Sequence, residues 1–329
     1  MLAKEACSGI VALGANQATK GVFMRTPKAL IVYFSQGGTN ARVADAIATG
    51  IREAGYEIDL WNLKNGHAPD IRGYQLLGIG SPVYYFHLPL NVSYYAQHLP
   101  DLGGMPAFVF IVHGSHRIDT ANWLRRTLER KGAREVGYFH CRGEAHVLPL
   151  LREGYLFSPD RPSEDELLEA RTFGEAVAAR TAGAGYVRPP FEPKPPLIYR
   201  LERLLASRWL MEHFYSRLFY VDCSKCTACG LCMEICPTGN ITRNPRGLPQ
   251  WDRRCLVCLS CEMKCPEEAI SSALSRLFPG ILLRWVFRYN VRRWVREGEL
   301  KYVRVTHRRG ALRRLGTVRS KETAVRANT

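Results

Sequence analysis

The sequence lacks several features that would assign a protein to a large class at once. No apolar run approaches the roughly 20 residues of a membrane-spanning helix, and the apolar patch at residues 9–15 has no clear signal cleavage site. The G-x-G-x-x-G fingerprint of dinucleotide-binding enzymes and the Walker lysine of nucleotide hydrolases are also absent. These absences argue against an integral membrane protein, a secreted protein and an enzyme that binds NAD or ATP through those motifs.

Acidic residues are scarce in the second half of the chain. The 329 residues carry 46 Lys and Arg against 30 Asp and Glu, a net charge of +16. From residue 198 to the end the counts are 25 and 11, whereas residues 1–197 hold 21 and 19. A surface of this sign favours a partner with an acidic face, or an anionic membrane. Nucleic acid is not expected as a partner, because no recognition motif accompanies the charge.

Cysteine carries the most specific chemistry in the sequence. Eight of the eleven cysteines form the pattern C-x-x-C-x-x-C-x-x-x-C-P twice. Three closely spaced thiolates can hold three corners of one [4Fe–4S] cube, whereas the fourth cysteine, before the proline, ligates the other cluster. The pattern therefore predicts two clusters with exchanged fourth ligands. Cluster I is expected on Cys226, Cys229, Cys232 and Cys265, and cluster II on Cys255, Cys258, Cys261 and Cys236.

Zinc sites and a disulfide framework are the alternatives for so many cysteines. Zinc sites pair C-x-x-C units over longer gaps, and disulfide frameworks suit short secreted chains, so neither predicts the doubled pattern. The stretch resembles the bacterial two-cluster ferredoxins, which place apolar residues where Ile241 and Ala269-Ile270 follow the two C-P pairs. Cys223 is interpreted as a bystander, because only the register that starts at Cys226 gives a C-P fourth ligand.

Strand and helix patterns alternate upstream of the cysteines. Strands are predicted at residues 29–34, 56–61, 74–80, 106–112 and 135–139, and helices at 43–54, 120–131 and 164–182. This alternation predicts an α/β fold with a doubly wound parallel sheet of five strands, covered by helices on both faces. Ligands of such sheets bind at the carboxyl ends of the strands.

Three loops follow the ends of these strands. The first is rich in glycine and hydroxyls and leads into a helix, an arrangement that can cradle a phosphate. The second offers an aromatic edge and the third a Gly-Ser turn, so the three together suit a phosphate joined to a flat ring, as in flavin mononucleotide (FMN). The candidate FMN-binding residues are Ser35, Gln36, Gly37, Gly38, Thr39, Asn40, Pro82, Val83, Tyr84, Tyr85, His113, Gly114 and Ser115.

Residues 29–182 resemble the flavodoxin family, whose phosphate loop typically reads S/T-x-T-G-x-T. Ser35 and Gly38 match that loop, whereas Gly37 and Asn40 replace its two threonines. Asn40 can still donate from its amide, but Gly37 removes a hydroxyl. An empty flavodoxin-like fold is therefore kept as an alternative.

The flavodoxin resemblance also implies the contacts of the flavin ring. Tyr84 or Tyr85 is expected to stack on the ring, and residues 113–115 are expected to line its other side. Ordinary packing of the two tyrosines is the alternative, since a fold does not by itself establish a site.

Composition suggests where the domains begin and end. Five prolines between residues 183 and 196 predict a semi-rigid spacer, and Met24 is an alternative start to the chain. The expected divisions are an N-terminal extension at 1–27, a flavodoxin-like domain at 28–183, a proline-rich linker at 184–197, a connecting amphipathic helix at 198–219, a small α+β two-cluster ferredoxin domain at 220–272, and a basic amphipathic helix with a flexible tail at 273–329.

The basic helix predicted within residues 273–329 has a consequence for where in the cell the protein is expected. It can cover the ferredoxin domain, with its arginines in solvent, or lie on an anionic membrane. We therefore expect a cytoplasmic protein, with the inner face of the membrane as an alternative location.

The chain as a whole resembles a flavodoxin–ferredoxin fusion protein. Such a protein is expected to relay low-potential electrons between FMN, two [4Fe–4S] clusters and a protein partner, since a flavin exchanges one or two electrons and a cluster exchanges one. No side chain stands out as a general acid or base, so we expect a carrier rather than an enzyme with its own organic substrate. The alternatives are a flavin-dependent reductase fed by its own clusters, and a ferredoxin with a flavin-free docking domain.

Overall fold

A computed structural model provides the structure of the chain. It describes residues 26–114, 117–146, 154–195, 197, 200, 203–204, 207–272, 291–308 and 311–317, with residues 208, 303–308 and 311–317 described in their backbone alone. The expected N-terminal extension, apart from its last two residues, and most of the expected basic helix lie outside the described residues. Within the described ranges, no helix combines the length and apolar character that crossing a bilayer requires.

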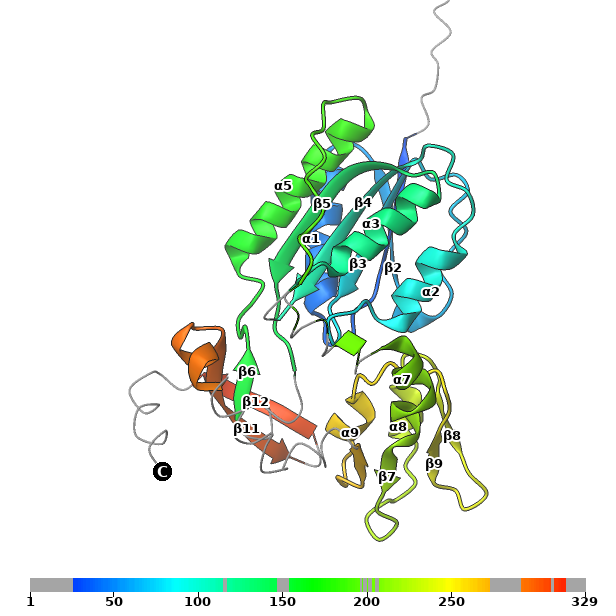
Figure 1. The fold of residues 1–329 in the computed structure, drawn as a ribbon, viewed down its shortest axis with the longest axis vertical. Coiled ribbons are helices and arrows are strands. Elements are labelled where there is room, and N and C mark those ends of the chain that lie inside the picture. Colours follow the sequence, from blue (N-terminus) through cyan, green and yellow to red (C-terminus); the bar gives the residue numbers. More distant parts are fainter. Residues whose placement is uncertain are drawn as a thin grey trace, which may run out of the picture.

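A five-stranded parallel sheet organises the first half of the chain (Figure 1). Its strands follow the order β2-β1-β3-β4-β5, and every neighbouring pair is parallel. The central strands consist of apolar side chains that are buried on both faces, as expected for a parallel sheet between two helical layers. The predicted doubly wound α/β fold is therefore confirmed. The strands are β1 (Lys28–Tyr33), β2 (Glu57–Asn62), β3 (Leu76–Pro82), β4 (Pro106–His113) and β5 (Arg134–Arg142).

Helices α1 (Thr39–Glu53) and α5 (Glu164–Thr181) cover one face of the sheet. They cross closely at two glycines, because a Cβ on Gly50 would lie 2.0 Å from the carbonyl oxygen of Arg171, and one on Gly174 2.2 Å from that of Ile47. The two helix backbones therefore meet directly.

Helices α2 (Leu90–His98) and α3 (Thr120–Arg130) cover the other face of the sheet. The sequence analysis missed α2. It is nine residues long and buries only Val92 and Ala96, so it shows little of the apolar periodicity that identifies a helix.

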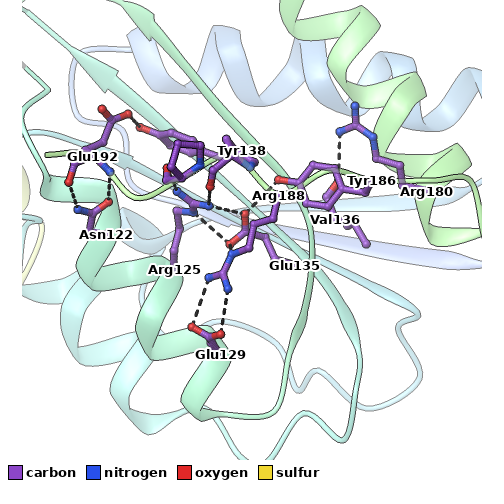
Figure 2. Close-up of polar contacts among 12 residues, drawn as sticks. Asn122, Arg125, Glu129, Glu135, Val136, Tyr138, Arg180, Tyr186, Arg188 and Glu192 are labelled. Atoms are coloured by element: carbon purple, nitrogen blue, oxygen red, sulfur yellow. Dashed lines mark hydrogen bonds and ion pairs between the residues drawn. The ribbon is translucent and has the colours of Figure 1, made fainter.

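The proline-rich linker is anchored to the flavodoxin-like domain and is not a free spacer (Figure 2). The fully buried guanidinium of Arg125, on α3, forms a bidentate ion pair with Glu135 of β5, with N–O distances of 2.8 and 3.0 Å. The same guanidinium donates hydrogen bonds to the carbonyl oxygens of Pro189 (2.7 Å) and Pro190 (3.2 Å). Prolines lack an N–H but keep carbonyl oxygens that a buried arginine can bind.

Two further contacts fasten this segment, residues 184–195, which we call the strap. The side-chain amide of Asn122 exchanges hydrogen bonds with the backbone of Glu192, at 2.8 and 3.0 Å. Arg188 pairs with Glu129 (2.9 Å) and with Glu135 (3.0 Å). The chain therefore leaves the flavodoxin-like domain from a fixed position on α3 and β5 (Figure 2).

The cysteine-rich region is built as two similar halves. Short helices α8 (Leu231–Glu234) and α9 (Ser260–Met263) each begin within a cysteine triplet. An outer antiparallel pair joins β7 (Phe219–Val221) to β10 (Ile270–Ser272), and an inner hairpin joins β8 (Ile241–Arg243) to β9 (Pro249–Trp251). The rings of Phe219 and Trp251 stack with centroids 4.8 Å apart and bring the two pairs together.

The connecting helix expected at 198–219 is not continuous, so that prediction was wrong. Ser207 is extended and its hydroxyl accepts a hydrogen bond from the N–H of Leu210, which makes it the N-cap of a separate helix, α7 (Arg208–His213). The 3₁₀ turn η2 (Tyr215–Arg217) and strand β7 follow. The apolar periodicity continues through Ser207, but serine favours an N-cap over a helix interior.

The flexible tail was also a wrong prediction for residues 300–308 and 311–317. They form an antiparallel pair, β11 (Leu300–Arg308) and β12 (Ala311–Thr317), and β11 pairs with β6 (Tyr155–Phe157) of the flavodoxin-like half (Figure 1). Arginine-rich composition suggested a tail, whereas the aromatic and β-branched residues at 302–306 favour a strand once a partner is present. That partner lies far away in the sequence.

Candidate cofactor-binding sites

Each predicted cysteine quartet lines a cavity of its own. The residues around the first cavity include Cys226, Cys229, Cys232 and Cys265. Those around the second include Cys236, Cys255, Cys258 and Cys261. Each cavity thus takes three thiols from one triplet and the fourth from the C-P pair of the other half.

The thiols within a cavity are close enough to oppose one another's ionisation. Burial raises the pKa of Cys232 to about 11, and the nearby thiols of Cys229, Cys265 and Cys226 add to the increase. Four thiols that disfavour one another's negative charge are a suitable donor set for a metal centre, whose positive charge stabilises the thiolates. The donor chemistry of the cavity therefore fits a cluster.

The same N–H···S hydrogen bond occurs in both halves of the cysteine-rich region. The backbone N–H of Asn240 donates to the sulfur of Cys236 at 3.3 Å, and that of Ala269 to the sulfur of Cys265 at 3.4 Å. In each half the donor stands four residues after the C-P cysteine. Such bonds stabilise negative charge on cluster sulfurs and raise the reduction potential.

The two cavities differ in exposure. Cys255 and Cys261 of the second cavity are buried, at 8% and 7% exposure, whereas Cys229 of the first is exposed. Cys223 is also exposed and lines neither cavity, as expected for a bystander. The first cavity therefore lies nearer the surface of the molecule.

The predicted phosphate loop joins β1 to α1. The hydroxyl of Ser35 accepts a hydrogen bond from the N–H of Ala41 at 3.2 Å, inside the first turn of α1. Asn40 is buried, and its amide nitrogen donates to the carbonyl oxygen of Phe34 at 2.8 Å. One N–H of this amide therefore holds the loop in place.

The two loop glycines leave open space above the helix. A Cβ on Gly37 or on Gly38 would meet no atom within 4 Å. Gly38 is the N-cap of α1, with a left-handed φ of 94°, and it has no side chain that could cap the helix. The loop thus forms a cradle that can accept a phosphate through backbone N–H groups, with Thr39 as the hydroxyl within it.

The second loop presents its tyrosines to the cysteine-rich region. The ring of Tyr84 packs edge-on against Phe34, with centroids 6.2 Å apart, and its hydroxyl donates to the side-chain oxygen of Gln36 at 3.3 Å. The hydroxyl of Tyr85 donates to the carbonyl oxygen of Val257 at 2.9 Å. Burial raises the pKa of both phenols well above the ordinary value, so both keep their protons as donors. Upstream, Pro82 ends β3 and Val83 bonds to β4.

The third loop begins at the end of β4. His113 is buried there, and its ring lies 5.9 Å from that of His140. The carbonyl oxygen of Gly114 accepts a hydrogen bond from Ser158 at 2.6 Å, and a Cβ on Gly114 would lie 2.5 Å from that of Ala145. Ser115 lies outside the described residues. No pattern in the sequence indicated this support from Ala145 and Ser158.

The C-terminal segment supports the third loop from outside. The carbonyl oxygen of Glu299 accepts a hydrogen bond from the N–H of Ser158 at 2.9 Å, and its carboxylate pairs with Arg142 of β5 at 2.9 Å. The chain thus returns to the flavodoxin-like domain after the cysteine-rich region.

The second cysteine triplet packs directly against the first two loops. Leu256 is only 3% exposed and belongs to the apolar cluster that also contains Phe34 and Leu88. The side-chain nitrogen of Gln36 donates to the sulfur of Cys258 at 3.4 Å. A leucine between two predicted cluster ligands was the signal in the sequence that could have suggested this interface.

Two family models match the chain. A flavodoxin domain matches residues 30–149, and a 4Fe–4S binding domain matches residues 219–242. The chain thus fuses a flavodoxin-like domain to a 4Fe–4S binding domain. The combination supports an electron-transfer role, and the second match supports at least one [4Fe–4S] cluster in the fusion protein.

The solved structures to which the chain is similar include flavodoxins. A flavodoxin from the domain Archaea is 15% identical, with a TM-score of 0.37, over 47% of this chain and 99% of its own. Flavodoxin 1 from Bacillus cereus is 20% identical, with a TM-score of 0.37, over 46% of this chain and 97% of its own. The rubredoxin oxygen:oxidoreductase from Desulfovibrio gigas is 16% identical, with a TM-score of 0.39, over 48% of this chain and 37% of its own. No curated protein matches the sequence.

Proposed function

We propose that the fusion protein relays low-potential electrons between FMN, two [4Fe–4S] clusters and a protein partner. The observation that carries this proposal is the contact of Gln36, in the predicted phosphate loop, with Cys258, a predicted ligand of cluster II. When bound, a flavin exchanges one or two electrons and a cluster exchanges one, so together they can convert pairs of electrons into single electrons. Direct packing between the domains is what such an exchange needs.

In this function the protein would hold the cofactors in fixed positions and shield them from water. The two quartets of cysteines bind the clusters, with Cys265 and Cys236 exchanged between the halves. The buried side chains of Leu256 and Val257 exclude water between the second quartet and the flavodoxin-like domain. Exclusion of water lowers the local dielectric and keeps donors and acceptors in fixed positions.

FMN would be held by the three loops at the carboxyl ends of the strands. The open cradle at Gly37 and Gly38 suits the phosphate, and Tyr84 and Tyr85 are proposed to border the ring. Backbone N–H groups and the hydroxyl of Thr39 are proposed as the main phosphate donors, since one N–H of the Asn40 amide is engaged by Phe34.

Cofactor content tests the proposal. Iron, sulfide and flavin are measured on one anaerobically purified sample. About eight irons and one FMN per chain are expected, because two cubane clusters hold four irons each. Four irons would contradict the second cluster. Eight irons without flavin, even after reconstitution with FMN, would leave a ferredoxin with a docking domain.

Replacing Gly37 with threonine is expected to tighten FMN binding about tenfold or more. The change restores a hydroxyl that the flavodoxin loop has at this position, and the site has room for a Cβ without a left-handed backbone. A hydrogen bond to a charged group contributes about 1.5–3 kcal/mol, and about 1.4 kcal/mol corresponds to a factor of ten. The dissociation constant is measured by quenching of flavin fluorescence.

Gly37→Val is the matched control, because valine has the same shape as threonine but no hydroxyl. It is expected to bind FMN no more tightly than the natural protein. Equal affinities of the threonine and valine variants would contradict a phosphate site at this loop.

A flavin-dependent reductase is the second candidate, and one cavity favours it. This cavity of about 960 Å³ lies beside Tyr84 and is bordered by α2, α3 and the strap. Its walls include Trp123, Phe191 and Arg126, which could hold a planar, anionic molecule. Steady-state turnover with small organic acceptors separates the candidates, because a carrier is expected to show none above that of free FMN.

The proposed partner is a redox protein with an acidic face. Arg243 borders the first cavity and donates to the carbonyl oxygen of Ala228 at 3.1 Å, and Lys225 lies next to Cys226 with its side chain more than half exposed. These two positive groups lie beside the first quartet, which is the more exposed one, and they favour docking of an acidic surface. An anionic membrane face remains part of the proposal through the basic residues beyond 272.

A further inference from the structure

Gln36 bonds at both ends of its side-chain amide. Its nitrogen donates to the sulfur of Cys258 at 3.4 Å, and its oxygen accepts from the hydroxyl of Tyr84 at 3.3 Å. A thiolate can only accept a hydrogen bond and a protonated phenol can donate one, so this orientation of the amide satisfies all three groups. Gln36 therefore joins two loops of the flavodoxin-like domain to a predicted ligand of cluster II.

The backbone around Gln36 is fixed, so the position of its side chain is well defined. Ser35, the preceding residue, exchanges hydrogen bonds with the side chain of Asn62, at 3.1 and 2.9 Å. Its hydroxyl is also bonded to the first turn of α1 at Ala41. The loop can therefore hold the amide against the sulfur without support from a ligand.

The Gln36 bond differs in origin from the N–H···S bonds at the C-P cysteines. Cys236 and Cys265 accept theirs from the backbone of their own domain. Cys258 accepts one from a side chain more than 200 residues earlier in the sequence, in the other domain. A side-chain donor can be removed by a substitution that leaves the backbone unchanged.

We propose that Gln36 is a positioning residue that raises the reduction potential of cluster II and leaves that of cluster I unchanged. A donor bonded to a cluster sulfur stabilises the reduced state more than the oxidised state, because the reduced cluster is more negative. Gln36 contacts the second quartet, through Cys258, whereas no residue of the phosphate loop lines the first cavity. This inference rests on the two clusters of the proposed function, but not on FMN.

The test is a redox titration of the full chain with both clusters in place and no flavin added, followed by electron paramagnetic resonance. Gln36→Leu is expected to lower one of the two cluster potentials and leave the other in place. The equilibrium constant for reduction should fall about tenfold, which corresponds to about 59 mV for a one-electron couple. Tyr84→Phe keeps the ring but frees the amide, so it should shift the same potential by less.

Gln36→Glu is the sharper variant, because a carboxylate beside the sulfur adds negative charge and should lower the same potential further than leucine does. Iron content and circular dichroism establish that each variant is folded and loaded. Unchanged potentials in both Gln36 variants, or equal shifts of both clusters, would overturn the inference. A sample with fewer than two clusters would instead contradict the proposed function itself, so the two failures are distinguishable.

Discussion

Cys265→Ser is expected to abolish the cluster held by the first triplet, although that triplet keeps its three cysteines. Cys265 stands next to the second triplet in sequence but lines the first cavity, with Cys226, Cys229 and Cys232. Its sulfur already accepts a backbone hydrogen bond from Ala269, the arrangement expected for a ligand. Iron is expected to fall from about eight to about four per chain, since each cubane cluster holds four.

Alkylation under anaerobic conditions identifies which cluster was lost. Free thiols react with iodoacetamide, whereas cysteines bound to iron are protected. In Cys265→Ser the cysteines that become labelled should be those of the first triplet, while Cys255, Cys258 and Cys261 stay protected. The mirror variant, Cys236→Ser, should give the opposite pattern. Labelling of the triplet next to the substitution would contradict the exchange of ligands between the halves.

Cys223→Ser is the matched control for both variants. Cys223 is a cysteine of the same region, but it is exposed and lines neither cavity. Its replacement should leave the iron content unchanged and remove only the label on Cys223 itself. A loss of iron in this variant would assign Cys223 a ligand role.

Arg125→Ala is expected to lower the free energy of unfolding of the flavodoxin-like domain by about 3–5 kcal/mol. The guanidinium is fully buried and pairs with Glu135 (Figure 2). It lies over the rings of Tyr138 and Phe191 at 5.0 and 4.8 Å. Its removal leaves a largely buried carboxylate with less compensation, which typically costs this amount. Urea unfolding of the domain, followed by tryptophan fluorescence, gives the value.

The same substitution should release the strap, because the carbonyls of Pro189 and Pro190 lose their donor. Hydrogen exchange in residues 184–195 is expected to become faster than in the natural protein. Arg126→Ala is the control, since Arg126 is exposed and contributes a cation–π contact with Phe191 worth about 0.5–1 kcal/mol. Equal losses in the two variants would contradict the role assigned to the buried ion pair.

The sheet and the cysteine quartets were predictable because each depends on local signals. Parallel strands buried on both faces are nearly continuous apolar runs, and each of the five was predicted to within three residues at either end. Ligand spacing follows from the size of a cubane cluster, so the repeated pattern defined the quartets that now line two cavities. Neither inference required knowledge of distant contacts.

The contacts between distant segments were not predictable. Gln36 is an ordinary loop residue until the fold brings Cys258 to within 3.4 Å of it. Strand β11 needs β6 as a partner, and the arginines around it suggested a tail. Asn40 was predicted as a donor for a ligand, and its amide also donates to the carbonyl oxygen of Phe34, a contact that no pattern indicated. In each case the deciding partner is remote in sequence or is a backbone atom, which sequence patterns do not reveal.

The most direct test of the account is the kinetics of electron transfer within one chain. Electrons are delivered by flash photoreduction to the flavodoxin-like domain of the FMN-loaded protein, and reduction of the ferredoxin-type domain is followed by its visible absorbance. The account predicts a rate that does not change with protein concentration, because Gln36, Leu256 and Tyr85 hold the two domains in contact. A rate proportional to protein concentration would show that electrons pass between molecules, and would contradict an internal relay.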